Sequence, residues 1–186
     1  LALMLAVAAV GLIRMGHLNA QVGRIVNQTN VKTALANDMI LALRDRAISM
    51  HTMSALDDLF ARYEEFDHFN ELGTRYRTAR ERLDGFALTA EEQAILARVK
   101  ALTVTTQPIV ETAVKAAQAG DDAEAQLART AAIPAQKKIA NELDAFLLLQ
   151  QAQTEEVLTA ATQSYNVTRT LMLTLGISAL LLGIGI

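Results

Sequence analysis

The sequence lacks several residue types that carry chemistry or cross-links. Among its 186 residues there is no cysteine and no tryptophan, and there are only two prolines and nine glycines. The absence of cysteine excludes disulfides, thiolate metal sites and a cysteine nucleophile. The scarcity of proline and glycine, with almost no alternating β-branched runs, argues against a fold rich in β-strands. The composition therefore favours a chain built mainly of helices.

An excess of charge of one sign is also missing. Lysine and arginine number 17 and aspartate and glutamate 20, which gives a net charge of −3, and no long basic run occurs. Nucleic-acid-binding domains carry a basic surface, so we predict no nucleic-acid partner. The sequence also contains no nucleophile-elbow, P-loop, zinc-protease or dinucleotide-binding motif. We therefore predict that this segment is not an enzyme and holds no cofactor.

Apolar residues are concentrated at the two ends of the sequence. Hydrophobic residues make up 52% of the chain, and 23 of the 29 residues in segments 1–13 and 171–186 are apolar, with no charge among them. Each segment is shorter than the ~20 residues that a membrane-spanning helix needs, so we interpret both as truncated spans of a longer protein. A signal-peptide core is the alternative for the first segment. The interpretation predicts one extracytoplasmic domain over residues 14–170.

The middle of the chain has the periodicity of long helices. Between residues 18 and 57 the seam positions recur at alternating spacings of four and three, which is typical of a helix that packs at a shallow angle against others. Similar repeats predict a second helix over about 61–86 and a long last helix. The third helix is predicted to start at the capping box Thr89–Glu92 and to end at Gly120.

Prolines and aspartates predict how these helices are interrupted. Pro108 falls inside the third helix, where we expect a kink. Asp121 and Asp122 can cap a short helix through about residue 130, and Pro134 suits the first turn of the last long helix. Four helices joined by short polar turns predict an all-α fold, an antiparallel up-down four-helix bundle. Its first and last helices are expected to continue into the two membrane segments.

Heights along the bundle follow from the rise per residue of a helix. With Arg14 and Arg169 at the membrane level, the turn at 87–89 lies at the height of Lys32. Below this turn only the first and last helices remain, yet both carry apolar seam residues, including Val22 and Val157. Two helices alone bury such a seam poorly, so we predict a homodimer that packs there.

Polar residues interrupt the seams at one level. Lys32 occupies a seam position on the first helix, and Gln150 and Gln153 occupy seam positions at the same height on the last helix. We predict a polar layer formed by these three residues. Two interpretations stay open: a hydrated layer that fixes the register of the helices, or a set of ligand contacts.

A group of cations is predicted near the membrane-distal end. Arg44 and Arg46 lie on the first helix at the level of Lys137, Lys138 and Asn141 on the last. Guanidinium groups are suited to holding a carboxylate or a phosphate, so these five residues are our candidate ligand-binding site. The alternative is a solvated face, with pairing to an acidic neighbour such as Asp45 or Glu142.

A metal site has weaker support. Glu65 and His68 form half of a di-iron bundle motif, but that site needs a second such motif and two further glutamates, and the other distal histidine is His51. Met50 and Met53 fall on the hydrophobic seam, where methionine is a common core residue. We therefore predict no metal, and a metal-binding bundle is the least favoured alternative.

Several segments of the chain are similar to a known family. The segments are Arg44–His51, Asp57–Phe60, Phe69–Gly73 with Ala79–Leu83, and Ala119–Asp122 leading to Ala132–Gln136. Over its whole length the chain resembles the four-helix-bundle sensor domain of bacterial methyl-accepting chemotaxis receptors and related membrane sensors, including those attached to GGDEF-type diguanylate cyclases.

The resemblance implies a function. It implies a homodimeric, periplasmic sensor domain in the bacterial inner membrane that signals through its second span to a cytoplasmic output. We expect the stimulus to be a small-molecule ligand or a periplasmic binding protein, and the output to be a diguanylate cyclase or a chemotaxis module. A dimerising periplasmic spacer without a ligand is the alternative.

Overall fold

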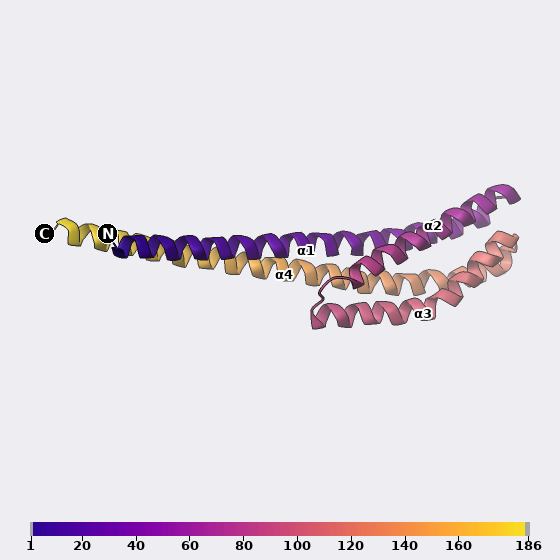
Figure 1. Cartoon of the computed structure of the whole chain (residues 1–186). Coiled ribbons are helices and arrows are strands. Elements are labelled where there is room, and N and C mark those ends of the chain that lie inside the picture. The colour runs from indigo at the N-terminus through magenta and orange to yellow at the C-terminus, as the bar shows by residue number, and fades with distance from the viewer. Residues whose placement is uncertain (1, 185–186) are drawn as a thin grey trace. The chain divides into compact units, whose positions relative to one another are not determined.

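The part of the chain that the structure describes is helical except for the turns that join its helices. The computed structural model describes the backbone of residues 2–184, and the side chains of residues 11, 16, 23, 28–174, 176 and 177. Over the described backbone there are four helices and no strand (Figure 1). The helices are α1 (Ala2–Ala55), α2 (Leu59–Asp84), α3 (Ala90–Ala119) and α4 (Asp122–Ile184).

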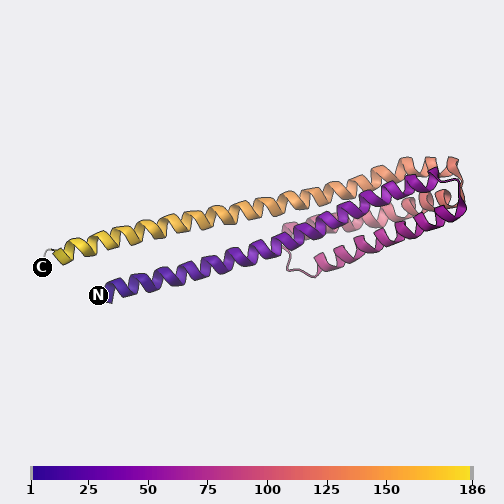
Figure 2. The same cartoon turned by 90° about the horizontal axis from the view of Figure 1, so that it is seen from above.

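The helices belong to two compact units, which we describe separately. One unit is Val31–Gln150, and the other is Leu1–Asn30 together with Gln151–Ile186. Within Val31–Gln150 the four helices alternate in direction and are joined by short turns (Figures 1 and 2). The predicted antiparallel up-down bundle is therefore confirmed for this unit.

Side chains and backbone hydrogen bonds mark the helix ends where the sequence predicts them. The capping box is formed, because Thr89 accepts from the backbone of Glu92 while the Glu92 carboxylate accepts from the backbone of Thr89. Asp58 caps α2 by accepting from the backbone N–H of Ala61 at 2.8 Å. Gly120 ends α3 with φ +77°, a left-handed conformation that favours glycine.

Pro108 and Pro134 both lie inside helices. The axis of α3, which contains Pro108, bends in Figure 1, as a proline in a helix interior predicts. The prediction that Pro134 starts a separate helix is wrong, because α4 runs without interruption from Asp122 to Ile184. Asp121 does cap it, accepting from the Glu124 N–H at 3.0 Å.

Packing explains why α4 continues through Pro134. Ala132 and Ile139 are buried in the core on either side of the proline, so a break would remove core contacts from both. Pro134 itself is exposed, and so is Thr130 one turn earlier, whose carbonyl loses its helical hydrogen bond to the missing N–H. An exposed carbonyl can bond to water instead, which makes the interruption tolerable.

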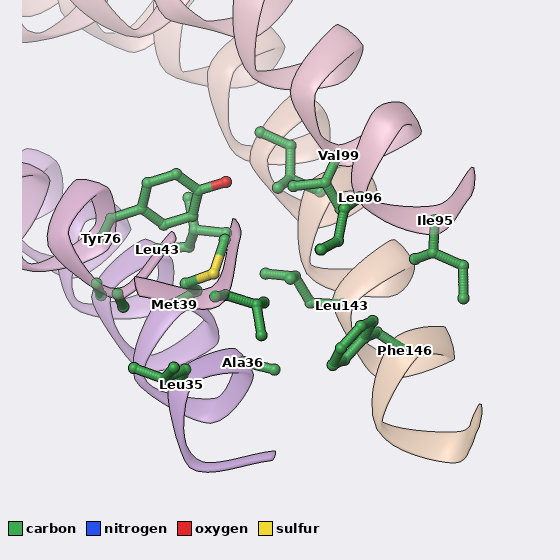
Figure 3. Close-up of a cluster of buried hydrophobic side chains, with 14 residues drawn as sticks. Leu35, Ala36, Met39, Leu43, Tyr76, Ile95, Leu96, Val99, Leu143 and Phe146 are labelled. Atoms are coloured by element: carbon green, nitrogen blue, oxygen red, sulfur yellow. The ribbon is translucent and has the colours of Figure 1, made fainter. Parts of the chain in front are cut away.

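The bundle core has two hydrophobic clusters. Figure 3 shows side chains from all four helices converging in the first cluster. The seam positions Ala36, Met39 and Leu43 are buried there, as the periodicity predicts. Met50 and Met53 are fully buried in the second cluster, which confirms their interpretation as core residues.

The second unit contains the start of α1 and the end of α4. Gly11 is buried, and a Cβ atom at this position would collide with the Met172 side chain, so the two helices approach closely there. Within the described residues, no helix is apolar over a long enough stretch to cross a membrane. Most side chains of segments 1–13 and 175–186, and that of Val22, lie outside the described residues. The predicted spans therefore stay predictions.

A candidate ligand cleft between helices α2 and α3

A cleft with a volume of about 840 Å³ opens on the bundle unit. Its exposed rim comes from α2 and α3, and its buried base contains residues of all four helices. The lining residues are Leu43, Arg46, Asn70, Gly73, Thr74, Tyr76, Arg77, Arg80, Glu81, Asp84, Thr103, Val104, Thr106, Gln107, Pro108, Val110, Gln136 and Ile139. This volume lies within the range of about 300–1,000 Å³ that is usual for small-molecule sites.

Arg46 extends from α1 into the base of the cleft. Its guanidinium carbon lies 4.1 Å from the centroid of the Phe69 ring, a cation–π contact that holds the side chain in place. Its Nε atom is buried and has no hydrogen-bond partner among the residues that the structure describes. Burial lowers the pKa of Arg46, while the nearby Tyr76 and Glu111 oppose this shift. The group remains a cation, because arginine is not deprotonated in proteins.

Gln136 extends from α4 into the same base. Only 4% of this residue is exposed, and neither its amide nitrogen nor its amide oxygen has a hydrogen-bond partner. A buried amide usually finds a partner, because leaving it unsatisfied costs about 1–3 kcal/mol. The amide thus has one donor group and one acceptor that no group in the described part of the chain satisfies.

Tyr76 and Thr103 contribute hydroxyl groups whose direction can be assigned. The two oxygens lie 3.1 Å apart, and the Thr103 hydroxyl also lies 2.8 Å from the Val99 carbonyl. Because the carbonyl can only accept, Thr103 donates to it and Tyr76 donates to Thr103. Burial raises the pKa of Tyr76, and the bond to Thr103 and the nearby arginines partly offset this. The phenol is therefore neutral near pH 7.

The rim carries charges of both signs. Arg80 pairs with Asp84 at 3.7 Å, whereas Arg77, also on α2, has no ion pair or hydrogen bond within the described residues. With Glu81, three arginines and two carboxylates line the cleft. Among the described residues, Arg46 has no ion pair with a carboxylate.

The structure distributes the five predicted site residues differently from the sequence analysis. Of the five, Arg46 lines the cleft. The other four, Arg44, Lys137, Lys138 and Asn141, are exposed and make no hydrogen bond or ion pair in the described part of the chain. Glu142, a suggested partner for them, instead accepts from Arg98 at 2.9 Å. That these four residues bind a ligand stays a prediction.

Two of the three residues of the predicted polar layer, Lys32 and Gln150, meet in the bundle unit through a further residue, Glu92. The Lys32 ammonium donates to both Glu92 carboxylate oxygens, at 3.0 and 2.9 Å, and to the Ala87 carbonyl at 3.0 Å. Gln150 donates to Glu92 as well, at 2.5 Å. The bond to Ala87 confirms that the turn at 87–89 lies at the height of Lys32. Gln153 is half-buried.

Glu92 is fully buried yet charged. Burial raises the pKa of its carboxyl group, but hydrogen bonds from Lys32, from the Thr89 backbone and from Gln150 lower it by more, so the net shift is downward. All three ammonium protons of Lys32 have an acceptor within the protein. These contacts join α1, α3 and α4 at one level, as the interpretation of a layer that fixes the register of the helices predicts.

The residues considered for a metal site do not form one in the described part of the chain. His68 is exposed and lies 3.9 Å from Glu71 on its own helix. In the part of the chain that the structure describes, no three histidine or acidic side chains are grouped in a way that could hold a metal ion.

Comparisons with known proteins place this architecture among sensors. No curated protein matches the chain. A solved structure described as the periplasmic sensor domain of a sensor histidine kinase is similar, with a TM-score of 0.61 and 17% sequence identity. The similarity covers 72% of this chain and 92% of that one. At this identity the likeness shows a shared fold.

A family of signalling domains matches directly. The model of the family described as a four helix bundle sensory module for signal transduction matches residues 1–165. The match includes every residue that lines the cleft and every residue of the polar layer. The chain therefore belongs to the family of four-helix-bundle sensory modules for signal transduction.

Proposed function

We propose that the chain is the ligand-binding input domain of a receptor in the bacterial inner membrane, with residues 14–170 in the periplasm. The observation that carries this proposal is the cleft, whose base contains residues of all four helices of a sensory-module bundle. A ligand shifts an equilibrium only through contacts that differ between two states. A molecule in this cleft contacts every helix whose packing could change.

Helix α4 is the proposed route of the signal. Gln136 and Ile139 of α4 lie in the cleft base, and the same helix continues to Ile184. Signalling helices commonly move by about 1–2 Å at such interfaces. A ligand that repositions α4 in the cleft would act on a cytoplasmic output, for which we propose a diguanylate cyclase or a chemotaxis module.

The proposal can be tested with a hybrid receptor in which residues 1–186 are joined to a diguanylate cyclase. Small organic acids, amino acids, sugars and aromatic compounds are added to cells, and cyclic dinucleotide is measured. Thr106→Phe fills the buried cleft base and should abolish the response. Thr105→Phe is the matched control, because Thr105 is exposed and does not line the cleft.

The outcome separates a sensor from a spacer. A response to at least one class of compound that is lost in T106F and kept in T105F supports the proposal. Output that no compound changes, and that persists when the distal half of the bundle is scrambled, would instead indicate a dimerising spacer.

The exposed cations can be compared with the cleft in the same receptor. We propose Arg44, Lys137, Lys138 and Asn141 as contacts for an anionic ligand or for a periplasmic binding protein. If this cluster takes part in binding, Arg44→Ala should weaken the response. If binding is confined to the cleft, Arg46→Ala should weaken the response and Arg44→Ala should not. An unchanged response in the R44A/R46A double variant to every effective stimulus would exclude a role for either arginine in ligand binding.

A further inference from the structure

The Lys32–Glu92 ion pair lies at the end of the bundle unit where a turn joins α2 to α3. The unit comprises Val31–Gln150, so Lys32 is its second residue and Gln150 its last. Glu92 belongs to the first turn of α3, and Lys32 also donates to the Ala87 carbonyl in the turn before that helix. Both α1 and α4 continue past these residues. The ion pair therefore lies where α1 and α4 leave the bundle unit.

The Glu92 carboxylate is held in a fixed position. One of its oxygens closes the capping box by accepting from the Thr89 N–H at 2.8 Å, and the other accepts from Gln150 of α4 at 2.5 Å. Lys32 donates to both oxygens and to the Ala87 carbonyl. Because Glu92 cannot follow a moving α1, a displacement that carries Lys32 away from the start of α3 breaks three bonds of a charged group at once.

The rest of α1 in this unit has no such contact with α3 or α4. Over residues 33–55, the hydrogen bonds and ion pairs that the structure describes between α1 and another helix go to α2. They join Asp38 to Arg75 at 2.7 Å and Ser49 to the Glu65 carbonyl at 3.2 Å. The packing of α1 on α3 and α4 takes place in the two hydrophobic clusters (Figure 3). Apolar contacts have no preferred direction, so a helix shift of about 1–2 Å costs them little. The same shift takes the bonds of the ion pair beyond the usual limit of about 3.2 Å.

The ion pair has the properties of an element with two states. A buried ion pair contributes little to stability compared with apolar residues of the same volume, and its best-attested role is to select one register or one state. A second state is open to both partners. Lys32 follows the exposed Val31, and a lysine ammonium can reach water on its long stem. Glu92 meanwhile keeps its bonds to Thr89 and Gln150.

From these observations we propose that Lys32 and Glu92 form a latch between α1 and α3 that sets the resting output of the receptor. With the latch closed, α1 is held against the start of α3, and the same carboxylate also holds α4 through Gln150. With the latch open, α1 shifts against α3 and α4, and the output changes. This inference rests on the proposed function, because it names a regulation of the same input domain, but it does not depend on which ligand binds.

The experiment measures the output of the hybrid receptor in cells to which no compound is added. The double variant K32M/E92Q removes the ion pair, while the glutamine can still close the capping box. A charged hydrogen bond that is made in one state only shifts a two-state equilibrium by about 10-fold or more, so cyclic dinucleotide per receptor should change by at least about threefold. Glu92→Gln alone is the second variant, in which Lys32 can still move to water. It should change the output in the same direction, even if the double variant does not accumulate in the membrane.

Two control variants separate the latch from other effects of substitution. D38N/R75M breaks a different ion pair of α1, the exposed one with α2, and should leave the resting output unchanged. Met53→Ala removes a fully buried side chain from the second hydrophobic cluster and destabilises the bundle without touching the latch. Its resting output should also stay unchanged, and urea unfolding measures how much stability each variant loses.

The outcomes distinguish the latch from the proposed function. An unchanged resting output in K32M/E92Q and E92Q would overturn the latch, and so would an equal change in M53A, because lost stability would then explain both. If the latch variants change the output and no compound does, the latch stands and the ligand-binding proposal fails. If compounds act through the cleft but the latch variants rest at the normal output, the latch is wrong and the sensor proposal stands. If neither changes the output, both fail.

Discussion

At the level of single residues, the Glu92 carboxylate serves two structures at once. It closes the capping box at the start of α3 and accepts hydrogen bonds from Lys32 of α1 and Gln150 of α4. A buried ion pair contributes little compared with an apolar pair of the same volume, but breaking it strands a charge. The stability of the bundle therefore depends on both partners being present together.

Lys32→Met should destabilise the bundle by about 3–5 kcal/mol, because it leaves the fully buried Glu92 without its cation. The double variant K32M/E92Q should recover part of this loss, since it removes the stranded charge and keeps a side chain that can close the cap. Urea unfolding followed by circular dichroism measures both values. A double variant less stable than K32M alone would show that the charge is not the source of the cost.

Stability should also depend on pH through Glu92. Its folded pKa lies below the ordinary value of 4.5, so the folded state binds a proton less readily than the unfolded state does. The resulting stabilisation is complete above pH 4.5 and is lost as the pH falls through the folded pKa. Melting temperatures recorded between pH 7 and pH 3 should fall less steeply in Glu92→Gln than in the unchanged protein. Parallel curves would contradict this assignment.

Single residues also show which parts of the site the sequence could predict. The polar layer was predictable, because Lys32 and Gln150 interrupt apolar seams and helix length places them at one height. Gln136 lies at a seam position before Ile139, but nothing in the sequence reveals that its amide lacks a partner. That property depends on which side chains the other three helices place around it. Arg46 was predicted as a ligand contact, yet its half-buried position over the Phe69 ring was not.

At the level of helices, local signals and packing compete. The capping box and the left-handed Gly120 satisfy local needs of the backbone at the two ends of α3. Such local signals can be found in the sequence, so those ends were predictable. Pro134 was misinterpreted because the sequence alone does not distinguish a proline in the first turn of a helix from a proline inside a continuous helix. Buried residues on both sides of it decide in favour of one continuous helix, and burial of this kind is a tertiary property.

Pro134→Ala tests that continuity. In an unbroken helix, alanine restores the missing N–H and removes the clash of the ring with the preceding turn, so the variant should be more stable by up to about 3 kcal/mol. Pro108→Ala, within α3, should act in the same direction. Urea unfolding provides the measurement. If P108A is stabilised and P134A is unchanged, Pro134 begins a helix rather than interrupting one.

At the level of the whole molecule, a homodimer is the proposed assembly, and the absence of cysteine makes it simple to test. Val157 of α4 is half-buried and lies on the predicted seam. Val157→Cys should form a disulfide-linked dimer when the chain is oxidised in membranes, whereas Glu156→Cys, one position away and exposed, should form much less. Non-reducing electrophoresis separates the two. A monomer for V157C at every concentration would contradict the dimer.

Transmission along α4 leads to a prediction for the complete receptor. Ala152 and Ala160 are exposed on α4, between the cleft residues and the second predicted span, so neither contacts the proposed ligand. Replacing both with glycine costs roughly 0.5–1 kcal/mol each and makes the helix easier to bend. In the hybrid receptor, A152G/A160G should reduce the response while calorimetric binding of the same compound stays unchanged. The control A97G/A101G places two glycines at exposed positions of α3 at a similar cost, and its response should persist. The two double variants differ in which helix, α4 or α3, carries the glycines. If both respond normally, the signal does not require a stiff α4.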